Sequence, residues 1–197
     1  MPVGGTFTSP GGITLPDNTI QRARIRRTQL WTNSKQEFLQ LLHHEIELHL
    51  RGAARKKLTP TIRLNGTSDI QWERVLLNGR TFFEHFPDVQ FYDYTKISKR
   101  LYDKTRPKNY YLCLSGSGAD AHYLARCEQA ERDGHSTVWV ARDQAKKEIL
   151  LAHARNQGVP AVDGDEHDLR FIDPPGARVI LKAKGSAKKE TNGFVLN

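Results

Sequence analysis

Polar side chains recur near the carboxyl ends of short apolar runs, where they offer both positive charge and hydrogen bonds to a phosphate-bearing ligand. Side chains alternate across a strand, so residues of one parity share a face. In the run at residues 60–67, Arg63 and Asn65 lie opposite Ile62 and Leu64. The candidate ligand-binding residues are Arg63, Asn65, Tyr94, Lys96, Ser115, Ser117, Arg170, Lys182 and Lys184. The alternative is that these are the solvated strand ends found in every α/β fold.

The segment from Ser115 to Asp120 reads Ser-Gly-Ser-Gly-Ala-Asp and leads from an apolar run into a helical pattern. Its small residues let backbone N–H groups approach an anion, and a helix N-terminus adds partial positive charge. The glycine spacing matches neither a Walker loop nor a complete dinucleotide-binding fingerprint. The alternative is a tight turn in which Ser117 or Asp120 caps the helix.

Residues 162–173 read VDGDEHDLRFID and gather carboxylates that suit a hard cation such as Mg²⁺. The ligands would be Asp163, Asp165, Asp168 and His167. A turn at Asp-Gly, with Arg170 neutralising the carboxylates, explains the same pattern without a metal. A third use is acid–base catalysis, for which the candidate residues are Asp69, Asp163 and Asp165. Asp93 competes for that role, but its parity turns it from the cavity.

The two cysteines, Cys113 and Cys127, lack the spacing of a metal site. They do not suggest a disulfide framework, so the cytoplasm of a bacterial host cell is the expected compartment. No run approaches the roughly 18 apolar residues of a membrane span, and the first residues do not resemble a secretory signal. We expect no membrane partner and no resident cofactor apart from the Mg²⁺ alternative. The oligomeric state stays open.

Basic residues are in excess and are clustered. The 197 residues carry a net charge of +8, from 30 Lys and Arg against 22 Asp and Glu. This excess favours polyanions, because neutralised phosphates release their condensed counterions, although many basic proteins bind no nucleic acid. Residues 22–27 read RARIRR, residues 51–57 read RGAARKK and residues 182–189 read KAKGSAKK. The candidate nucleic-acid-binding residues are Arg22, Arg24, Arg26 and Arg27.

Six apolar runs alternate with helical or irregular stretches. The runs lie at 60–67, 89–96, 110–117, 136–142, 161–163 and 177–184, and the candidate helices near 35–54, 70–86, 97–103, 119–133 and 143–157. Strands that alternate with helices pair in parallel through right-handed crossovers. We therefore predict an α/β fold with a mostly parallel sheet of five or six strands, open or forming an incomplete (β/α) barrel. Such folds bind ligands at the carboxyl ends of their strands.

The first 30 residues combine a stretch rich in Gly, Pro, Thr and Ser with the RARIRR cluster, and we predict an extended basic arm there. A long helix follows, because Ser34 and Glu37 have the spacing of a capping box and apolar residues then repeat at helical spacing. This helix would open a single α/β domain over residues 31–197.

Two stretches carry a resemblance to a known family. Residues 61–70 read TIRLNGTSDI, and residues 86–96 read FPDVQFYDYTK, a strand that ends in Tyr-Thr-Lys. With later segments around Asp163, Asp168 and residues 181–185, they resemble phage and prophage proteins of the gene-product-88-like group, over about residues 22–195. That group is similar in turn to radical S-adenosylmethionine enzymes, which implies a partial barrel.

Radical enzymes of that kind hold an iron–sulfur cluster with three closely spaced cysteines, usually Cys-x-x-x-Cys-x-x-Cys, because thiolates bind the iron. This chain has only Cys113 and Cys127. The resemblance therefore implies the partial barrel without the cluster or the radical reaction, and it transfers no particular activity.

Three functions fit these observations. The first is a phage or mobile-element accessory protein that binds a nucleotide or nucleic acid at the carboxyl ends of the strands. The second is an enzyme of undetermined reaction that uses the Asp residues of the same cavity. The third is an inhibitor that binds a protein of a host system through its arm and basic surface. We favour the first, because the polar groups extend two positions into the strands.

Overall fold

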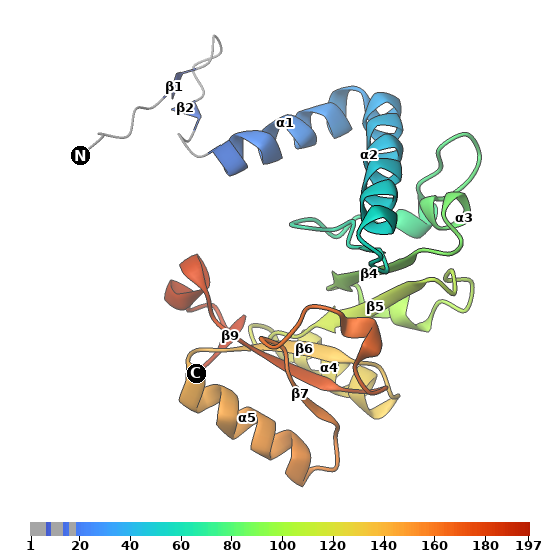
Figure 1. The fold of residues 1–197 in the computed structure, drawn as a ribbon. Coiled ribbons are helices and arrows are strands. Elements are labelled where there is room, and N and C mark those ends of the chain that lie inside the picture. The colour runs from blue at the N-terminus through green and yellow to red at the C-terminus, as the bar shows by residue number, and fades with distance from the viewer. Residues whose placement is uncertain (1–6, 9–13, 16–18) are drawn as a thin grey trace. The chain divides into compact units, whose positions relative to one another are not determined.

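The computed structural model describes residues 7–8, 14–15 and 19–197 (Figure 1). These residues fall into two compact units. One unit holds the described residues up to Pro60 together with Leu76–Phe82, and the other holds Thr61–Val75 and Phe83–Asn197. The predicted division into an arm up to residue 30 and a single α/β domain from residue 31 stays a prediction. None of the helices in the described part of the chain is long and apolar enough to cross a membrane.

The first unit contains β1 (Phe7–Thr8), which pairs with β2 (Thr14–Leu15) in antiparallel fashion, and then α1 (Thr19–Asn33). The prediction of extended structure is wrong for residues 19–30, because they lie in α1. Arginine, glutamine and alanine favour a helix. Thr28 and Thr32 are weaker helix formers, and they are accommodated by hydrogen bonds from their hydroxyls to carbonyls four residues earlier. The rest of the predicted arm lies largely outside the described residues.

The long helix predicted at residues 35–54 is confirmed as α2 (Lys35–Arg55). Its predicted capping box does not form, because the Ser34 side chain makes no capping hydrogen bond. The Ser34 N–H donates to the Leu30 carbonyl at 2.8 Å, and the Phe38 N–H donates to the Ser34 carbonyl at 3.0 Å. The backbone ladder thus runs from α1 into α2, and Trp31 packs edge-to-face on Phe38 at 5.4 Å.

The second unit is built on a parallel sheet, seven-stranded over residues 61–197, all of which are described (Figure 1). Its strands are β3 (Thr61–Ile62), β4 (Gln90–Thr95), β5 (Tyr110–Ser115), β6 (Thr137–Ala141), β7 (Ala161–Asp163), β8 (Arg178–Lys182) and β9 (Val195–Leu196). The order is β3-β4-β5-β6-β8-β7, and β9 also pairs with β6. The predicted α/β fold with an open, mostly parallel sheet is confirmed. Only β9 was missed, since two residues carry no readable period.

The helices of this part of the chain are mostly short. They are α3 (Phe82–His85), α4 (Ala121–Arg132) and α5 (Gln144–Asn156), with 3₁₀ turns η1 (Trp72–Arg74), η2 (Ser98–Tyr102), η3 (Arg170–Ile172) and η4 (Gly185–Lys189). The predicted helix at 70–86 is wrong except at η1 and α3. Asn78 and Gly79 have φ of 51° and 78°, so a turn interrupts it. The predicted end of α4 is confirmed, with Gly134 at φ 81°.

The strand register decides which side chains share a face. Tyr94 pairs with Cys113, Ser115 with Val138, and Val138 with Val179. We call the face that these residues form the open face. The opposite, helix-covered face carries Trp139 and Asp163, which contact Glu131 of α4 and Lys147 of α5. Figure 1 shows α5 beside β6 and β7.

Candidate functional site

A cavity of about 700 Å³ opens at the carboxyl ends of the strands of the second unit. We call it the strand-end cavity. Its polar lining includes Arg63, Asp69, Tyr94, Lys96, Ser115 and Asp168, and its apolar lining includes Val138, Val140, Leu181 and Phe194. Val138, Val140 and Leu181 lie on the open face, so the cavity forms where that face reaches the carboxyl ends of the strands.

Arg63, Tyr94 and Asp168 form one wall of the strand-end cavity. The Arg63 guanidinium lies 4.5 Å from the centre of the Tyr94 ring and donates to Asp168 Oδ2 at 3.0 Å. Asp168 Oδ1 accepts from the Tyr94 hydroxyl at 2.6 Å. Burial, and then Asp168, raises the pKa of Tyr94 well above its usual range, so Tyr94 stays protonated and donates. The long loop after β7 is thereby tied across the open face to β4.

Lys96 stands at the opposite wall. Its Nζ lies 4.7 Å from the centre of the Phe194 ring and 5.5 Å from that of Tyr123, and donates to the Ser115 carbonyl at 3.4 Å. No carboxylate among the described residues forms an ion pair with this ammonium. Burial lowers the pKa of Lys96, because its charged form has lost part of its hydration without gaining a full counter-charge.

Neighbouring residues engage both carboxylate oxygens of Asp69. Its Oδ1 pairs with Arg100 Nη1 at 2.7 Å, and its Oδ2 accepts from the Lys96 N–H at 2.7 Å and from the Thr95 hydroxyl at 3.1 Å. Both oxygens are therefore occupied, and this carboxylate positions the end of β4. A general base needs an oxygen that is open to substrate, and both oxygens of Asp69 already accept hydrogen bonds; its predicted catalytic role stays a prediction.

Asn65 points into the protein, although the sequence placed it in the cavity. Its backbone N–H donates to Asp93 Oδ1 at 2.7 Å, and its side-chain amide donates to the Ile70 carbonyl at 3.0 Å. Its Oδ1 accepts from Ser68, from the Ile70 N–H and from the Trp72 indole. Asn65 thus shapes the loop that carries Arg63 and Asp69, and contacts with ligand would break these bonds.

Asp93 lies on the helix-covered face, as its parity indicates, and burial raises its pKa to about 6. Because this value exceeds the ordinary 3.8, the folded state holds the proton more tightly than the unfolded chain. Its contribution to stability is complete below pH 3.8 and falls as the pH rises through about 6, a loss of about 3 kcal/mol.

We expect Asp93→Asn to remove this pH dependence. The free energy of unfolding, measured by urea denaturation from about pH 4 to about pH 7, should fall less steeply in the variant than in the parent chain. The comparison cancels the other titrating groups, which both chains share. Parallel curves for the two chains would show that Asp93 titrates normally.

The Ser115–Asp120 segment forms the capped turn, and its backbone N–H groups donate to acceptors within the protein. The Asp120 carboxylate accepts from the Tyr123 N–H at 2.7 Å, and Ser117 Oγ accepts from the Ala119 N–H at 3.2 Å. The Gly118 N–H donates to the Gly193 carbonyl at 2.9 Å. Asp120 places a carboxylate at the N-terminus of α4, as the alternative of a capped turn predicts, and Ser117 does not line the cavity.

The carboxylates of Asp163 and Asp165 lie on the helix-covered face of the sheet. Lys147 Nζ lies 2.8 Å from Asp163 and 3.2 Å from Asp165, and Lys184 Nζ lies 2.8 Å from Asp165. Burial alone would raise the pKa of both carboxyls, but these lysines hold it below the ordinary value. Asp163 and Asp165 are therefore ionised near neutral pH and paired with lysine outside the cavity, and their predicted catalytic role stays a prediction.

The remaining basic candidates also point elsewhere. Lys182 shares a parity with Ile180 on the helix-covered face, so β8 presents Leu181 to the cavity instead. Arg170 is buried, pairs with Asp173 at 3.3 Å and donates to the His167 carbonyl. Over the described residues, no three or more His, Cys, Asp and Glu side chains group as a metal would require. The predicted Mg²⁺ ligands do not converge, because Asp163 and Asp165 pair with Lys147 whereas Asp168 pairs with Arg63.

The four arginines of the RARIRR cluster lie on α1, in the first unit. Arg24, Arg26 and Arg27 are exposed and Arg22 is partly exposed. The helix has no buried side chain, which leaves this basic surface open to solvent.

A family model described as Gene product 88 matches residues 13–197. The chain belongs to the gene product 88 family. This is a phage-type family, and the match spans nearly the whole chain, both units included. No curated protein and no solved structure matches the chain.

In this member of the gene product 88 family, the structure gathers five of the predicted site residues at one cavity, namely Arg63, Asp69, Tyr94, Lys96 and Ser115. It places Asn65, Ser117, Asp163, Asp165, Arg170, Lys182 and Lys184 outside the cavity, and Arg22, Arg24, Arg26 and Arg27 on α1. Phe194 had not been considered, because it belongs to a C-terminal stretch without strand or helix periodicity. Asp168 had been considered only as a metal ligand, and its role as the anchor of Arg63 follows from a contact between distant segments.

Proposed function

We propose that this member of the gene product 88 family is a phage accessory protein that binds a phosphate-bearing ligand, a nucleotide or nucleic acid, in the strand-end cavity. The observation that carries the proposal is Lys96. Its ammonium lines the cavity, lies 4.7 Å from the centre of the Phe194 ring and forms no ion pair with a described carboxylate. A phosphate oxygen supplies the counter-charge that this group lacks.

Arg63 would provide the second contact. Its Nη1 is engaged with Asp168 and its Nε with the Asn65 carbonyl at 3.3 Å, so the guanidinium is held in one orientation over Tyr94. Its other terminal nitrogen, Nη2, has no hydrogen-bond partner among the described residues and would be left for the ligand. The Tyr94 and Phe194 rings line the same cavity, and aromatic faces stack on bases.

The state of the carboxylates favours binding over catalysis. Asp69 and Asp168 are the carboxylates that line the cavity, and each is held by an arginine. The other two candidates, Asp163 and Asp165, pair with Lys147 on the far face of the sheet. An enzyme that used these residues would first have to break an ion pair, whereas a phosphate bound to Lys96 breaks none among the described residues.

We expect Lys96→Gln combined with Arg63→Gln to weaken binding of a labelled single-stranded oligonucleotide by about tenfold or more, in fluorescence anisotropy titrations. The slope of log affinity against log salt concentration should become shallower by about one to two. A free nucleotide, titrated by calorimetry, tells whether the ligand is the monomer or the strand.

The matched control is Lys182→Gln combined with Lys188→Gln, which also removes two positive charges, from exposed residues outside the cavity. It should change affinity much less than the cavity variants do. Equal losses in control and cavity variants would mean that only net charge matters, and would count against a site in the cavity.

A further inference from the structure

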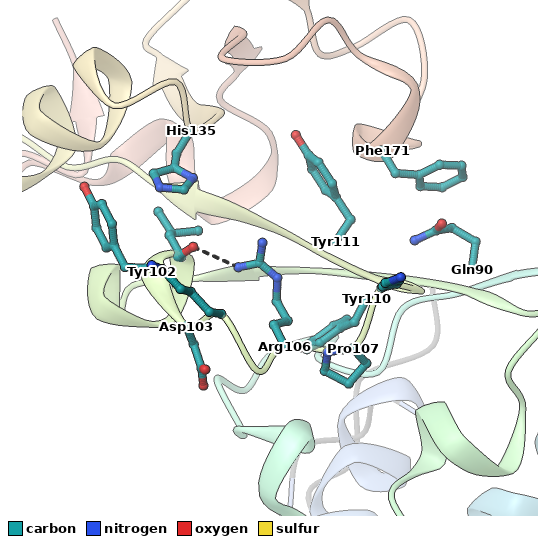
Figure 2. Close-up of a pocket in the computed structure, with 12 residues that line it drawn as sticks. Gln90, Tyr102, Asp103, Arg106, Pro107, Tyr110, Tyr111, His135 and Phe171 are labelled. Carbon is teal, nitrogen blue, oxygen red and sulfur yellow. Dashed lines mark hydrogen bonds between the residues drawn. The ribbon is translucent and has the colours of Figure 1, made fainter.

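A second pocket, of about 590 Å³, lies near the amino ends of β4 and β5, away from the strand-end cavity (Figure 2). Its key lining residues are Gln90, Tyr102, Arg106, Tyr111, His135 and Phe171. We propose that this amino-end pocket is a separate nucleotide-binding site, in which Arg106 binds the phosphate and the aromatic rings receive the base.

Arg106 is fixed by the backbone and presents a free edge. Its Nη1 donates to the carbonyls of Arg100 and Leu101, each at 3.1 Å. The Nε and Nη2 atoms have no partner among the described residues, and together they form the edge that binds two oxygens of one phosphate. Figure 2 shows the guanidinium between Tyr102 and His135 on one side and Tyr111 on the other.

The charge of the pocket suits an anion. Lys104 and Lys108 join Arg106 in its lining, and Asp103 is the only carboxylate there among the described residues. The Asp103 carboxylate accepts from the N–H and the hydroxyl of Thr105, at 2.9 and 2.6 Å. In Figure 2 it points away from the guanidinium. A phosphate therefore meets three cations without a competing ion pair at Arg106.

The rings are held in place before any ligand arrives. The Tyr111 hydroxyl donates to Ser136 Oγ at 2.8 Å, and the Tyr102 ring meets His135 edge-to-face at 4.7 Å. Phe171 packs on Tyr92 at 5.6 Å. Because the rings lose little freedom on binding, stacking of a base on them retains most of its favourable free energy.

Gln90 adds a fixed acceptor. Its Nε2 donates to the carbonyls of Phe91 and Asn109, at 2.7 and 3.3 Å, so its Oε1 is turned from them. Figure 2 shows this oxygen on the side of Phe171. An exocyclic amino group of a base stacked on Phe171 would find an acceptor there. A pocket that offers contacts to a phosphate, to a base and to an amino group of that base suits a nucleotide better than a simple anion.

His135 provides a local reporter. Burial, and then the positive charge of Arg106, lowers the pKa of His135, while Asp133 acts in the opposite sense. A phosphate bound to Arg106 offsets that charge, so the pKa of His135 should rise on binding. NMR titration of the histidine resonances in the full chain measures it, with His135→Gln used for assignment.

The probes are AMP, inorganic phosphate and a single-stranded oligonucleotide, each titrated by calorimetry and each tested for the His135 shift. We expect AMP to raise the pKa of His135 and to bind about tenfold more tightly than inorganic phosphate, because only AMP has a base to stack. Tighter binding of the oligonucleotide than of AMP would identify strand nucleic acid as the source of the nucleotide. Equal affinity for AMP and phosphate would overturn the proposal.

Variants locate the binding. Arg106→Lys keeps the charge and loses the bidentate edge, and should weaken AMP about tenfold. Phe171→Leu does not alter the hydrogen bonds from Arg106 to the carbonyls of Arg100 and Leu101. It should weaken AMP binding by about threefold or more, and it tests the pocket even if Arg106→Lys disturbs the fold. Arg155→Lys, at an exposed position of α5, is the control and should have no effect.

The proposals for the amino-end pocket and the strand-end cavity can be tested independently of each other. Lys96→Gln in the strand-end cavity should leave the AMP-induced shift of His135 unchanged. If both Arg106→Lys and Phe171→Leu bind AMP as the parent chain does, or if His135 does not respond to AMP, the amino-end pocket is not a nucleotide site.

Discussion

The Arg100→Met variant should unfold with a free energy about 3–5 kcal/mol below that of the parent chain. Arg100 is 4% exposed, and its guanidinium bonds Glu73 through Nε and Nη2, at 2.8 and 2.7 Å, and Asp69 at 2.7 Å. Without it, the nearly buried Glu73 carboxylate loses its counter-charge while its hydration is still excluded. Removing one partner of a buried ion pair costs far more than the pair contributes over an apolar replacement.

Urea denaturation at about pH 7 measures this change, with Arg155→Met as a control expected to stay within about 0.5 kcal/mol. Adding Glu73→Leu to Arg100→Met should restore part of the loss, because it removes the carboxylate left without a partner. A single-variant effect below about 1 kcal/mol would show that water solvates Glu73 in the folded chain. The Arg100 variant should also weaken ligand binding at the strand-end cavity, since Asp69 positions the backbone of Lys96.

The Lys147→Met variant should lose about 3 kcal/mol near pH 7. Lys147 is 4% exposed, and its ammonium is shared by Asp163 and Asp165. Among the described residues, its removal leaves the two neighbouring carboxylates with one ion-pair partner, Lys184, whose side chain is 72% exposed. Like charges in a partly dehydrated position repel each other strongly.

The loss should depend on pH in a defined direction. The ion pairs hold the pKa of Asp163 and Asp165 below the ordinary 3.8. Their contribution is thus present above about pH 4 and is lost as the pH falls below it. Urea denaturation at about pH 7 and about pH 3 should show the gap between parent and Lys147→Met narrowing at the lower pH.

The adjacent Lys146→Met variant, also on α5, is the matched control. Lys146 makes no ion pair with a described carboxylate, and its replacement should change stability by less than about 0.5 kcal/mol. A gap that stays constant from neutral to acid pH would mean that Lys147 contributes through packing rather than charge.

The amino-acid sequence by itself determined the positions of most strands, their parallel pairing and several polar residues at their ends. These features depend on local signals, such as apolar runs, turn residues and the alternation of side chains. Arg63, Tyr94 and Lys96 were found in this way, because each lies within a few residues of a readable strand end. The glycine that ends α4 is equally local, since a positive φ is a property of that one residue.

The tertiary structure alone decided which charges meet. Arg63 and Asp168 are 105 residues apart, and the contact exists because the loop after β7 returns to β4. Register decided that β8 offers Leu181 rather than Lys182 to the cavity, since a shift of one residue exchanges the faces of a strand. The strength of an ion pair depends on distance and burial, and neither is encoded in a short stretch of chain.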